Sequence, residues 1–496
     1  MTAGLIDPSR NGPRPTALVA GPADLHLPLI LAGRVVPRAS TEVVVETPIG
    51  RILVARPDAE DVGSIDGGGA AIARELAEAD LRDVSTYLQR LGVAWLDRLD
   101  DLGRRWAPLL ESTTGLRWRI IRADYESVGS WLLHRENHYD ILRSELGTDH
   151  AFDEWQRVAS VRQRAVGRGL VFHGLVGNIP MAGLFSVVRG LITRNRNLVK
   201  LPARDPLSVH LFARCAIDVA PDHPLTRGLS VLYWPRGDAI GRDLVRLADA
   251  ACLWGSAAGI EQLRAWLRPT VPCVALGPRR SGAVIDLTHP QADVDDAAVR
   301  LAADVCFYDQ EACLSPQRAH VLGDVDQLRG PLGAALERIS RSLPRLARSL
   351  DDEAHIRLVH EEARVRGWSI DHGEDWLVVA GDDRQFDLAH PLRRTIFLHR
   401  CADLAAATSW FDDDTQTIAV HPYALVEEVG RRACTAGGSR IVELGLTRHP
   451  RRGFVHDGQR VLPQLVRWVA IEDDMVHGSR FGSQTPAELR RQLMEL

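Results

Sequence analysis

The stretch Asn197-Leu198-Val199-Lys200-Leu201-Pro202-Ala203-Arg204-Asp205-Pro206 decides the fold class of this chain. Its short apolar run is typical of a strand, and the two prolines mark a turn and the start of a helix. Strands that lead through tight turns into helices build open α/β sheets, whose ligands bind just outside the carboxyl ends of the strands. The sequence therefore predicts an α/β fold with Lys200 at a ligand-binding edge.

Lys200 is also the only lysine among the 60 lysine and arginine residues of the chain. An ammonium is a compact point charge, whereas a guanidinium is a broad planar fork, so the two groups fit different sites. A lysine retained among arginines is a candidate for contact with ribose hydroxyls or a phosphate. The alternative is a lysine left on the surface by chance, where most lysines lie. The position at a strand end favours the binding role.

Length and composition indicate an ordinary globular protein of two or three domains, with 496 residues, 45% hydrophobic and 25% charged. A net charge of -5 without a basic stripe argues against a nucleic-acid binder. No apolar run is long enough for a membrane span, and the N-terminus lacks a signal-peptide pattern. The 7 cysteines are scattered, odd in number and without a CxxC pair, which is typical of free thiols in a reducing cytoplasm.

Hydrophobic periodicity divides the chain into regions. Residues 25–56 show a β pattern with a hairpin turn at Thr47–Gly50, and residues from about 70 to 147 form a helical block. From about residue 170 onward, two sets of short apolar runs alternate with helical stretches, which predicts two α/β lobes with a cleft between them. Neither GxGxxG nor a P-loop occurs, which disfavours an ordinary Rossmann dehydrogenase and a nucleotide triphosphatase.

Cys313 is the candidate nucleophile. It lies in the polar loop Tyr308–Gln317, whereas other cysteines lie in apolar runs typical of buried thiols. A nucleophilic thiol needs access and a local field that favours the thiolate, and an accessible but inert thiol is the alternative. Asp309 and Glu311 would raise its pKa if they pointed at it, so we expect both to face away.

A metal site formed by Cys306, Cys313 and His320 is a second interpretation of this region. The spacing of these residues matches no familiar zinc motif. We therefore predict no metal.

Asn178 is the candidate oxyanion donor. It lies in Gly177-Asn178-Ile179-Pro180, between a short apolar strand and the helical segment 182–193. A side-chain amide can donate to a developing oxyanion, and the flanking glycine and proline fix the loop that aims it. An asparagine in a turn before a helix is also common for structural reasons alone.

Together these segments resemble the aldehyde dehydrogenase superfamily. Lys200 with Pro206 resembles its strand-end lysine, Gly177–Pro180 its oxyanion turn, and Gln310–Cys313 its nucleophile loop. More closely, the chain is similar to the LuxC-like acyl-CoA reductases of bacterial bioluminescence, from about Leu25 to Gly482. The segments that carry this similarity are Asp309–Gln317, Gly190–Thr193, Arg440–Leu446, and His456–Gly458 through Leu465–Val469.

The resemblance implies an aldehyde dehydrogenase-like α/β fold, with a Rossmann-like cofactor lobe and an α/β catalytic lobe. We expect a flexible tail over 1–24, a helical block and NAD(P)-binding domain over 25–275, a catalytic domain over 276–445, and a C-terminal segment over 446–496 that returns to the cofactor lobe or an oligomer interface. The resemblance assigns cofactor binding to Lys200, Pro202, Arg204, Gly255 and Ser256. Gly255 would admit the pyrophosphate and Ser256 would bind it at a helix start, although Gly-Ser is also common strand-to-helix punctuation.

Departures from the superfamily pattern refine the expected chemistry. Hydrolytic aldehyde dehydrogenases carry a general-base glutamate where this chain has Ala275, so an acyl-enzyme should resist hydrolysis. Ala203-Arg204 follows Lys200 where a glutamate often grips the ribose 2′-hydroxyl, which favours NADPH, with NADH as the alternative. No glutamate near Arg393–Ile396 matches the one that usually holds the nicotinamide ribose.

The resemblance therefore implies NADPH-dependent reduction of an acyl thioester to an aldehyde. Cys313 would carry the acyl group, Asn178 would stabilise the oxyanion, and CoA or a carrier-protein thiol would leave. We expect a cytoplasmic homo-oligomer, with an acyl-activating synthetase as a possible partner and with neither nucleic-acid binding nor an integral membrane segment. The alternatives are NAD(P)-dependent oxidation of an aldehyde to an acid, and a non-redox scaffold that passes acyl groups within a complex.

Overall fold

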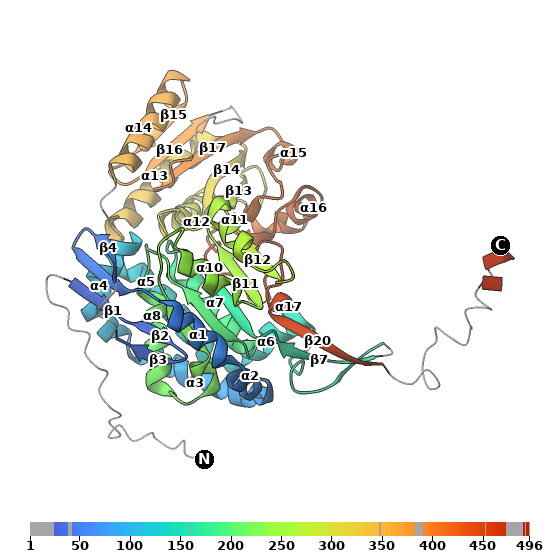
Figure 1. Cartoon of the computed structure of the whole chain (residues 1–496). Helices are drawn as coiled ribbons and strands as arrows, with labels where there is room; N and C mark the ends of the chain where they lie inside the picture. The colour runs from blue at the N-terminus through green and yellow to red at the C-terminus, as the bar shows by residue number, and fades with distance from the viewer. Residues whose placement is uncertain are drawn as a thin grey trace, which may run out of the picture.

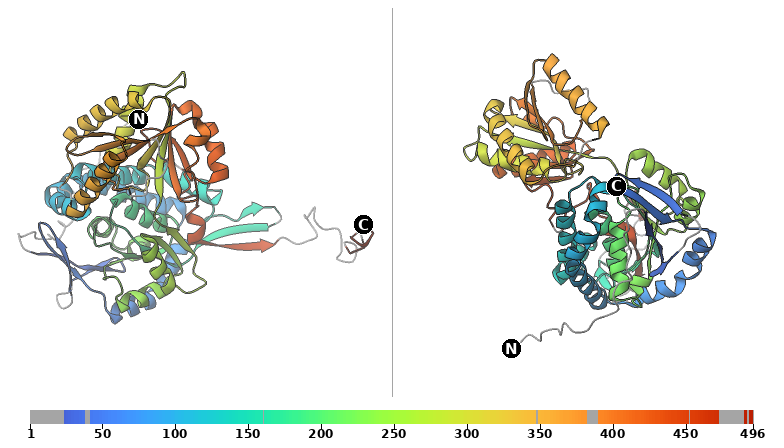
Figure 2. Two further views of the ribbon diagram at one scale, coloured as in Figure 1. Left: turned by 90° about the horizontal axis from the view of Figure 1, so that it is seen from above. Right: turned by 90° about the vertical axis from the view of Figure 1, so that its left-hand side faces the viewer.

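The computed structural model describes residues 24–37, 42–159, 161–346, 349–381, 390–451, 453–472, 490–491 and 493–495. Two lobes, each built around a seven-stranded sheet, lie against each other (Figures 1 and 2). The tail expected over residues 1–24 lies outside the described residues, apart from Asp24.

The first sheet, in the cofactor lobe, has the strand order β12-β11-β8-β9-β10-β2-β3. The five strands from β12 to β10 in this order run parallel and are mostly apolar, because helices cover both faces. β2 and β3 continue the sheet in antiparallel pairing. The strands are β2 (Leu29–Leu31), β3 (Arg34–Val36), β8 (Leu170–Gly174), β9 (Arg196–Lys200), β10 (Leu229–Leu232), β11 (Ala250–Trp254) and β12 (Cys273–Leu276). The accompanying helices are α7 (Pro180–Ile192), α8 (Ser208–Val219), α9 (Pro224–Arg227), α10 (Ala239–Arg246) and α11 (Ala257–Trp266).

A small N-terminal sheet contains β1 (Asp24–Leu27), β4 (Glu42–Thr47) and β5 (Gly50–Ala55), and it confirms the predicted hairpin. The first part of the predicted β pattern over residues 25–56 is divided at Pro28 into two strands, β1 and β2. β1 pairs with β5, whereas β2 pairs with β10 of the cofactor sheet. Proline has no N–H to give to a sheet, so the chain changes partners there.

The predicted helical block is confirmed, and it shares one core with the cofactor lobe. Trp95 is fully buried, and its ring lies 4.9 Å from that of Tyr125 and 5.4 Å from that of Phe212 in the cofactor lobe. The same apolar cluster includes Tyr308 of the nucleophile loop. The helices are α1 (Ala59–Gly67), α2 (Gly69–Glu78), α3 (Leu81–Asp97), α4 (Leu99–Thr114), α5 (Trp118–Leu133) and α6 (Arg135–Leu146).

The second sheet, in the catalytic lobe, has the order β15-β16-β17-β14-β13-β18-β19. Its strands are β13 (Arg280–Asp286), β14 (Pro316–Leu322), β15 (Ser369–His372), β16 (Leu377–Gly381), β17 (Thr395–Cys401), β18 (Thr415–His421) and β19 (Arg440–Glu443). The helices are α12 (Val294–Cys306), α13 (Val325–Ser342), α14 (Leu350–Val365), α15 (Leu404–Ala407), η1 (Tyr423–Leu425) and α16 (Val426–Ala436). Sequence periodicity missed β14, which begins directly after the Cys313 loop and pairs with β13 and β17.

A second three-stranded sheet projects from the body (Figure 1) and contains β6 (Gln156–Val158), β7 (Val161–Gly167) and β20 (Val466–Glu472). Before β20, α17 (Leu462–Leu465) packs on the cofactor sheet, where Leu465 lies in one cluster with Val171 and Ala250. Within the C-terminal segment, α17 therefore lies against the first seven-stranded sheet. Over the part of the chain that the structure describes, no helix is both long and apolar enough to cross a membrane.

Candidate active site

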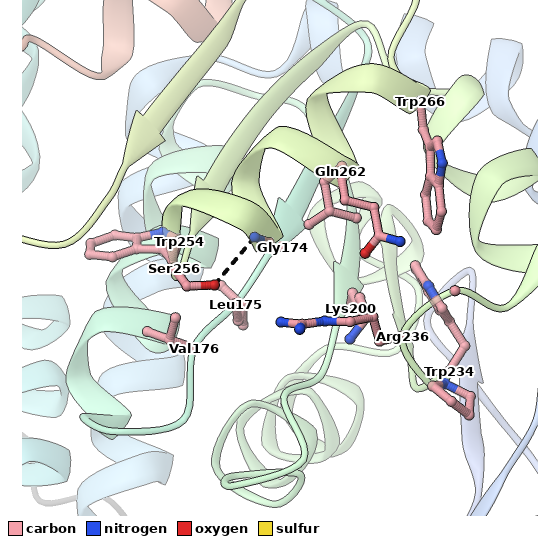
Figure 3. Close-up of a pocket in the computed structure, with 15 residues that line it drawn as sticks. Gly174, Leu175, Val176, Lys200, Trp234, Arg236, Trp254, Ser256, Gln262 and Trp266 are labelled. Carbon is pink, nitrogen blue, oxygen red and sulfur yellow. Dashed lines mark hydrogen bonds between the residues drawn. The ribbon is translucent and has the colours of Figure 1, made fainter.

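Neighbouring parallel strands of the cofactor sheet end at one cavity. Lys200, the last residue of β9, lies in register between Gly174 of β8 and Leu232 of β10. The cavity beyond these strand ends has a volume of about 220 Å³. Besides Lys200, its lining includes Val176, Trp234, Arg236, Gly255, Ser256 and Gln262. Figure 3 shows Lys200 and Arg236 close together, with Trp254 and Ser256 on one side and Trp266 on the other.

Lys200 brings a positive charge to this cavity without a carboxylate beside it. None of the described residues that line the cavity is an aspartate or a glutamate. The Lys200 Nζ donates to the backbone oxygen of Leu201 at 3.5 Å and lies 5.6 Å from the ring centroid of Trp234. Burial, and then the charge of Arg236, lowers the pKa of Lys200 to about 8. Two cations without a counter-charge create a site that favours an anionic ligand.

The entrance to α11 adds neutral anion-binding groups to the same cavity. Gly255 has a φ of 149°, a conformation that favours glycine. Ser256 is the N-cap of α11, and its Oγ accepts a hydrogen bond from the Gly259 N–H at 3.2 Å. The N-terminus of a helix presents unpaired N–H groups and attracts phosphate. Gly255 and Ser256 therefore join Lys200 in one site.

The structure does not bring Pro202 and Arg204 to this cavity. Neither residue is part of its lining. The Arg204 guanidinium turns away from the cavity: it lies 3.2 Å from the Glu311 carboxylate of the Cys313 loop and donates to the Thr114 carbonyl of the helical block at 2.9 Å. The second cation of the cavity is Arg236, which follows β10 and which sequence reasoning did not single out. The signal that could have found it is the Pro-Arg-Gly turn after a predicted strand.

The loop that carries Cys313 is held in an unusual backbone conformation. Asp309 and Gln310 have φ values of 51° and 61°, a region that costs energy for residues other than glycine. The Gln310 amide holds the loop by donating to the Thr395 carbonyl at 2.6 Å and accepting from the Thr395 N–H at 2.9 Å. The Cys313 carbonyl accepts a hydrogen bond from the Ser281 hydroxyl at 2.6 Å. The backbone around Cys313 is therefore fixed from both sides.

The acidic side chains of this loop face away from Cys313, as expected. Asp309 accepts from Arg394 Nε at 2.5 Å. Glu311 pairs with Arg204 and with Arg393. Both carboxylates are thus neutralised by arginines rather than placed against the thiol.

Asn178 lies beside the nucleophile loop. Its Nδ2 donates to the Glu311 carbonyl at 2.8 Å, two residues before Cys313. A primary amide carries two N–H donors, so one remains for another acceptor. Gly177 allows this approach, because a Cβ there would lie 2.6 Å from the Asp205 backbone nitrogen. The structure therefore places the Asn178 side chain against the loop that carries Cys313.

Cys313 itself is half-buried, and its environment favours the protonated thiol. Burial, and then the negative charge of Asp457, raises its pKa to about 11, while a hydrogen bond from Gln416 acts in the opposite direction. The Gln416 Nε2 also donates to the Asp457 carboxylate, so the amide touches both groups. Sequence reasoning missed Gln416 and gave Asp457 no role, since both come from distant segments.

The turn that carries Asp457 lies between Cys313 and the cofactor cavity. The ring of His456 lies 5.0 Å from that of Trp254 in the cavity lining. The Gln459 Nε2 donates to the Ala275 carbonyl at 3.4 Å. Ala275 is the position where the superfamily pattern places a general base, so this turn occupies the neighbourhood of the missing glutamate.

The alternative metal site finds no support in the geometry. Among the described residues, no group of at least three histidine, cysteine or acidic side chains is arranged to hold a metal ion. Cys306 is buried at the end of α12, and the His320 ring stacks 5.2 Å from that of Trp410.

The chain has the fold of the aldehyde dehydrogenases. The solved structure of aldehyde dehydrogenase 21 from Physcomitrella patens is 14% identical with a TM-score of 0.71, over 91% of this chain and 98% of that one. Lactaldehyde dehydrogenase from Escherichia coli is 13% identical with a TM-score of 0.69, over 91% of this chain and 99% of that one. The predicted fold class is confirmed.

The chain belongs to the acyl-CoA reductase (LuxC) family, whose model matches residues 76–468. It is 31% identical to the long-chain acyl-protein thioester reductase of Vibrio harveyi over 405 residues, which cover 80% of this chain and 84% of that one. It is 28% identical to the protein of the same name from Aliivibrio fischeri over 399 residues, covering 79% and 82%. The predicted family is confirmed, and with it an aldehyde-forming oxidoreductase that reduces an acyl thioester.

Proposed function

We propose that this protein reduces its acyl thioester through a covalent acyl group on Cys313, with NADPH bound at the Lys200 cavity. The observation that carries the proposal is the pairing of a cysteine loop beside a side-chain amide with a cationic cavity at the strand ends. The presence of Ala275, rather than a general-base glutamate, favours reduction over hydrolysis.

The charges of the cavity support a nicotinamide cofactor with a 2′-phosphate. Lys200 and Arg236 would hold the adenosine ribose and its phosphate, and Ser256 at the start of α11 would hold the pyrophosphate. NADH lacks the 2′-phosphate and would leave this pair of cations with one anion fewer. The bound cofactor supplies the hydride.

The first chemical stage is an exchange of thiols. The Cys313 sulfur forms a bond to the carbonyl carbon of the donor thioester, the bond from that carbon to the donor sulfur breaks, and the proton of Cys313 passes to the departing thiol. The oxyanion of the tetrahedral intermediate would be stabilised by the free N–H of Asn178 and by the Cys313 backbone N–H. The exchange consumes no net proton, so a resting thiol is compatible with it.

The second stage releases the product. Hydride addition at the acyl carbon, together with one proton, converts the thioester on Cys313 into a thiohemiacetal. Cleavage of its carbon–sulfur bond frees the aldehyde and returns the proton to the Cys313 sulfur. Water is poorly activated meanwhile, because Asp457 accepts from Gln416 and lies 3.6 Å from Arg279 Nε.

The donor is proposed to be acyl-CoA or an acyl group on a protein thiol. The relatives are named acyl-protein thioester reductases, which favours a protein-bound donor supplied by an acyl-activating synthetase. The projecting sheet is the proposed interface of a homo-oligomer, since Trp468, Val469 and Ile471 of β20 are partly exposed there.

The central experiment compares Cys313→Ala with Cys434→Ala, which removes an exposed thiol on α16. Both variants are incubated with acyl-CoA or acyl-carrier protein, and then with NADPH and an aldehyde trap. Cys313→Ala should carry no acyl adduct and form no aldehyde, while Cys434→Ala should match the parent protein. Aldehyde formation by Cys313→Ala would overturn the proposal. If the protein converts an aldehyde to an acid without a thiol acceptor, the alternative of NAD(P)-dependent aldehyde oxidation is favoured. If it binds neither NADPH nor NADH, the alternative of a non-redox acyl-transfer scaffold is favoured.

The cofactor proposal has its own matched pair. Arg236→Gln removes a cation at the cavity, whereas Arg242→Gln removes an exposed one on α10. A charge-assisted contact with a phosphate contributes about 1.5–3 kcal/mol, so Arg236→Gln should weaken NADPH binding roughly 10- to 100-fold and leave NADH binding nearly unchanged. Lys200→Met should weaken both cofactors. Equal loss of NADPH and NADH affinity in Arg236→Gln would contradict a 2′-phosphate contact.

A further inference from the structure

A buried carboxylate outside the site just described connects its two halves. Asp124 lies on α5 of the helical block and is 2% exposed. The Tyr308 hydroxyl donates to its Oδ1 at 2.6 Å. The Met181 backbone N–H donates to its Oδ2 at 3.2 Å. One side chain thus binds both the catalytic lobe and the cofactor lobe.

The two donors belong to the segments that carry the reacting groups. Tyr308 begins the loop that leads to Cys313, and Met181 lies in the first turn of α7, directly after the Asn178 turn. The N-cap residue of α7 is Ile179, whose side chain makes no capping hydrogen bond. The Asp124 carboxylate supplies this cap from α5, and its negative charge favours the positive end of the helix.

We propose that Asp124 is a positioning residue, whose ionised carboxylate holds the Asn178 turn and the Cys313 loop in the relative placement that acyl transfer requires. The inference rests on the proposed function, because it assigns oxyanion stabilisation to Asn178 and acyl transfer to Cys313. It extends that function by placing the control of alignment in the helical block.

The charge state of Asp124 makes this alignment sensitive to pH. Burial raises its pKa to about 7, against the hydrogen bonds from Tyr308 and Met181. The charge of Arg448 lowers the pKa of Asp124, and the charge of Asp205 raises it. Burial and the charges of Asp205 and Asp124 raise the pKa of the neighbouring Tyr125 hydroxyl. Below pH 7 the carboxyl gains a proton, so it can no longer accept both bonds as an anion. Acyl transfer should therefore fall as the pH drops through about 7.

The test separates alignment from the mere presence of a thiol. Acylation by a thioester needs Asn178 and Cys313 together, whereas alkylation of Cys313 by iodoacetamide needs only the sulfur. Asp124→Asn keeps the shape of the side chain and removes its charge. Above pH 7 it should acylate Cys313 at least tenfold more slowly than the parent, while alkylating it at the parent rate at every pH. The ratio of the acylation rate to the alkylation rate cancels the thiolate fraction of Cys313, and in Asp124→Asn this ratio should no longer rise between pH 6 and pH 8.

Glu145→Gln is the matched control, since Glu145 is a buried acid of α6 that binds the Leu462 N–H at 2.6 Å and touches neither loop. It should keep the parent pH profile. If Asp124→Asn does not fold, Tyr308→Phe, which removes one of the two bonds, should lower acylation selectively in the same way.

Parent-like acylation with a parent-like pH profile in Asp124→Asn, or in Tyr308→Phe where that variant takes its place, would overturn the role of Asp124. An equal loss of acylation and alkylation would overturn it as well, because it would indicate general damage. Failure of the proposed function is distinct, since the parent protein itself would then carry no acyl group on Cys313.

Discussion

The pKa of Cys313 gives a direct test of the site, because it can be measured on the protein without substrate or cofactor. Burial and the charge of Asp457 raise the pKa of Cys313 to about 11, whereas an ordinary thiol has a pKa of about 8.5. At pH 7.5, roughly 0.03% of Cys313 would be thiolate, compared with roughly 9% of an ordinary thiol. The more basic thiolate is intrinsically more nucleophilic, which offsets roughly tenfold of this roughly 300-fold deficit. We expect Cys313 to be alkylated about 30-fold more slowly than an accessible thiol of ordinary pKa.

The assay is iodoacetamide labelling from pH 6 to pH 10, followed peptide by peptide with mass spectrometry. Exposed Cys434 is an internal reference, and buried Cys215 and Cys252, whose pKa values burial raises to about 12, should react last. Because the accessibility of each thiol also affects its absolute alkylation rate, the pKa of Cys313 is judged from how its alkylation rate changes with pH. The rate at Cys313 should rise about tenfold per pH unit without levelling off. A plateau below pH 9 would refute the reasoning about its surroundings.

Three further results are expected. Asp457→Asn should lower the pKa of Cys313 and speed its alkylation at pH 7.5 severalfold, since it removes the negative charge beside the thiol, and the same labelling series measures this. Gly177→Ala should slow acylation more than tenfold and also lower the melting temperature, because its Cβ would lie 2.6 Å from the Asp205 backbone nitrogen and the backbone must shift. Asp124 has a pKa raised to about 7, so the parent should lose stability as the pH rises toward and through 7, whereas Asp124→Asn, which cannot ionise there, should lack this decline when denaturant unfolding is compared at pH 5 and pH 8.

The fold was largely predictable because apolar runs and helical periods report burial directly. The parallel strands ending at Gly174, Lys200, Leu232 and Trp254 stand where the sequence places them. The prediction missed β14 for a physical reason. β14 begins at a proline and carries polar residues, and it is a strand because β13 and β17 flank it, which a local pattern cannot show.

The site was predictable where its residues follow strand ends. Lys200, Gly255 and Ser256 meet at the cavity for that reason, and Asn178 reaches the nucleophile loop from the turn after β8. Gln416 and Asp124 were not predictable, because they act through contacts across lobes and carry no local motif. Identifying them requires knowledge of which distant backbones pack together.

The treatment of negative charge around Cys313 explains how one loop can favour reduction over hydrolysis. A carboxylate acts as a base toward water only if it is free to accept a proton. Glu311 is neutralised by Arg204 and Arg393, and Asp457 accepts a hydrogen bond from Gln416. Arg204, which the resemblance assigned to the cofactor, therefore neutralises Glu311 of the Cys313 loop, and Arg236 provides the second cation of the cavity instead. Under the proposed function, we therefore expect selectivity to depend on which acids are neutralised by arginines or hydrogen bonds, and not on how many acids lie near Cys313.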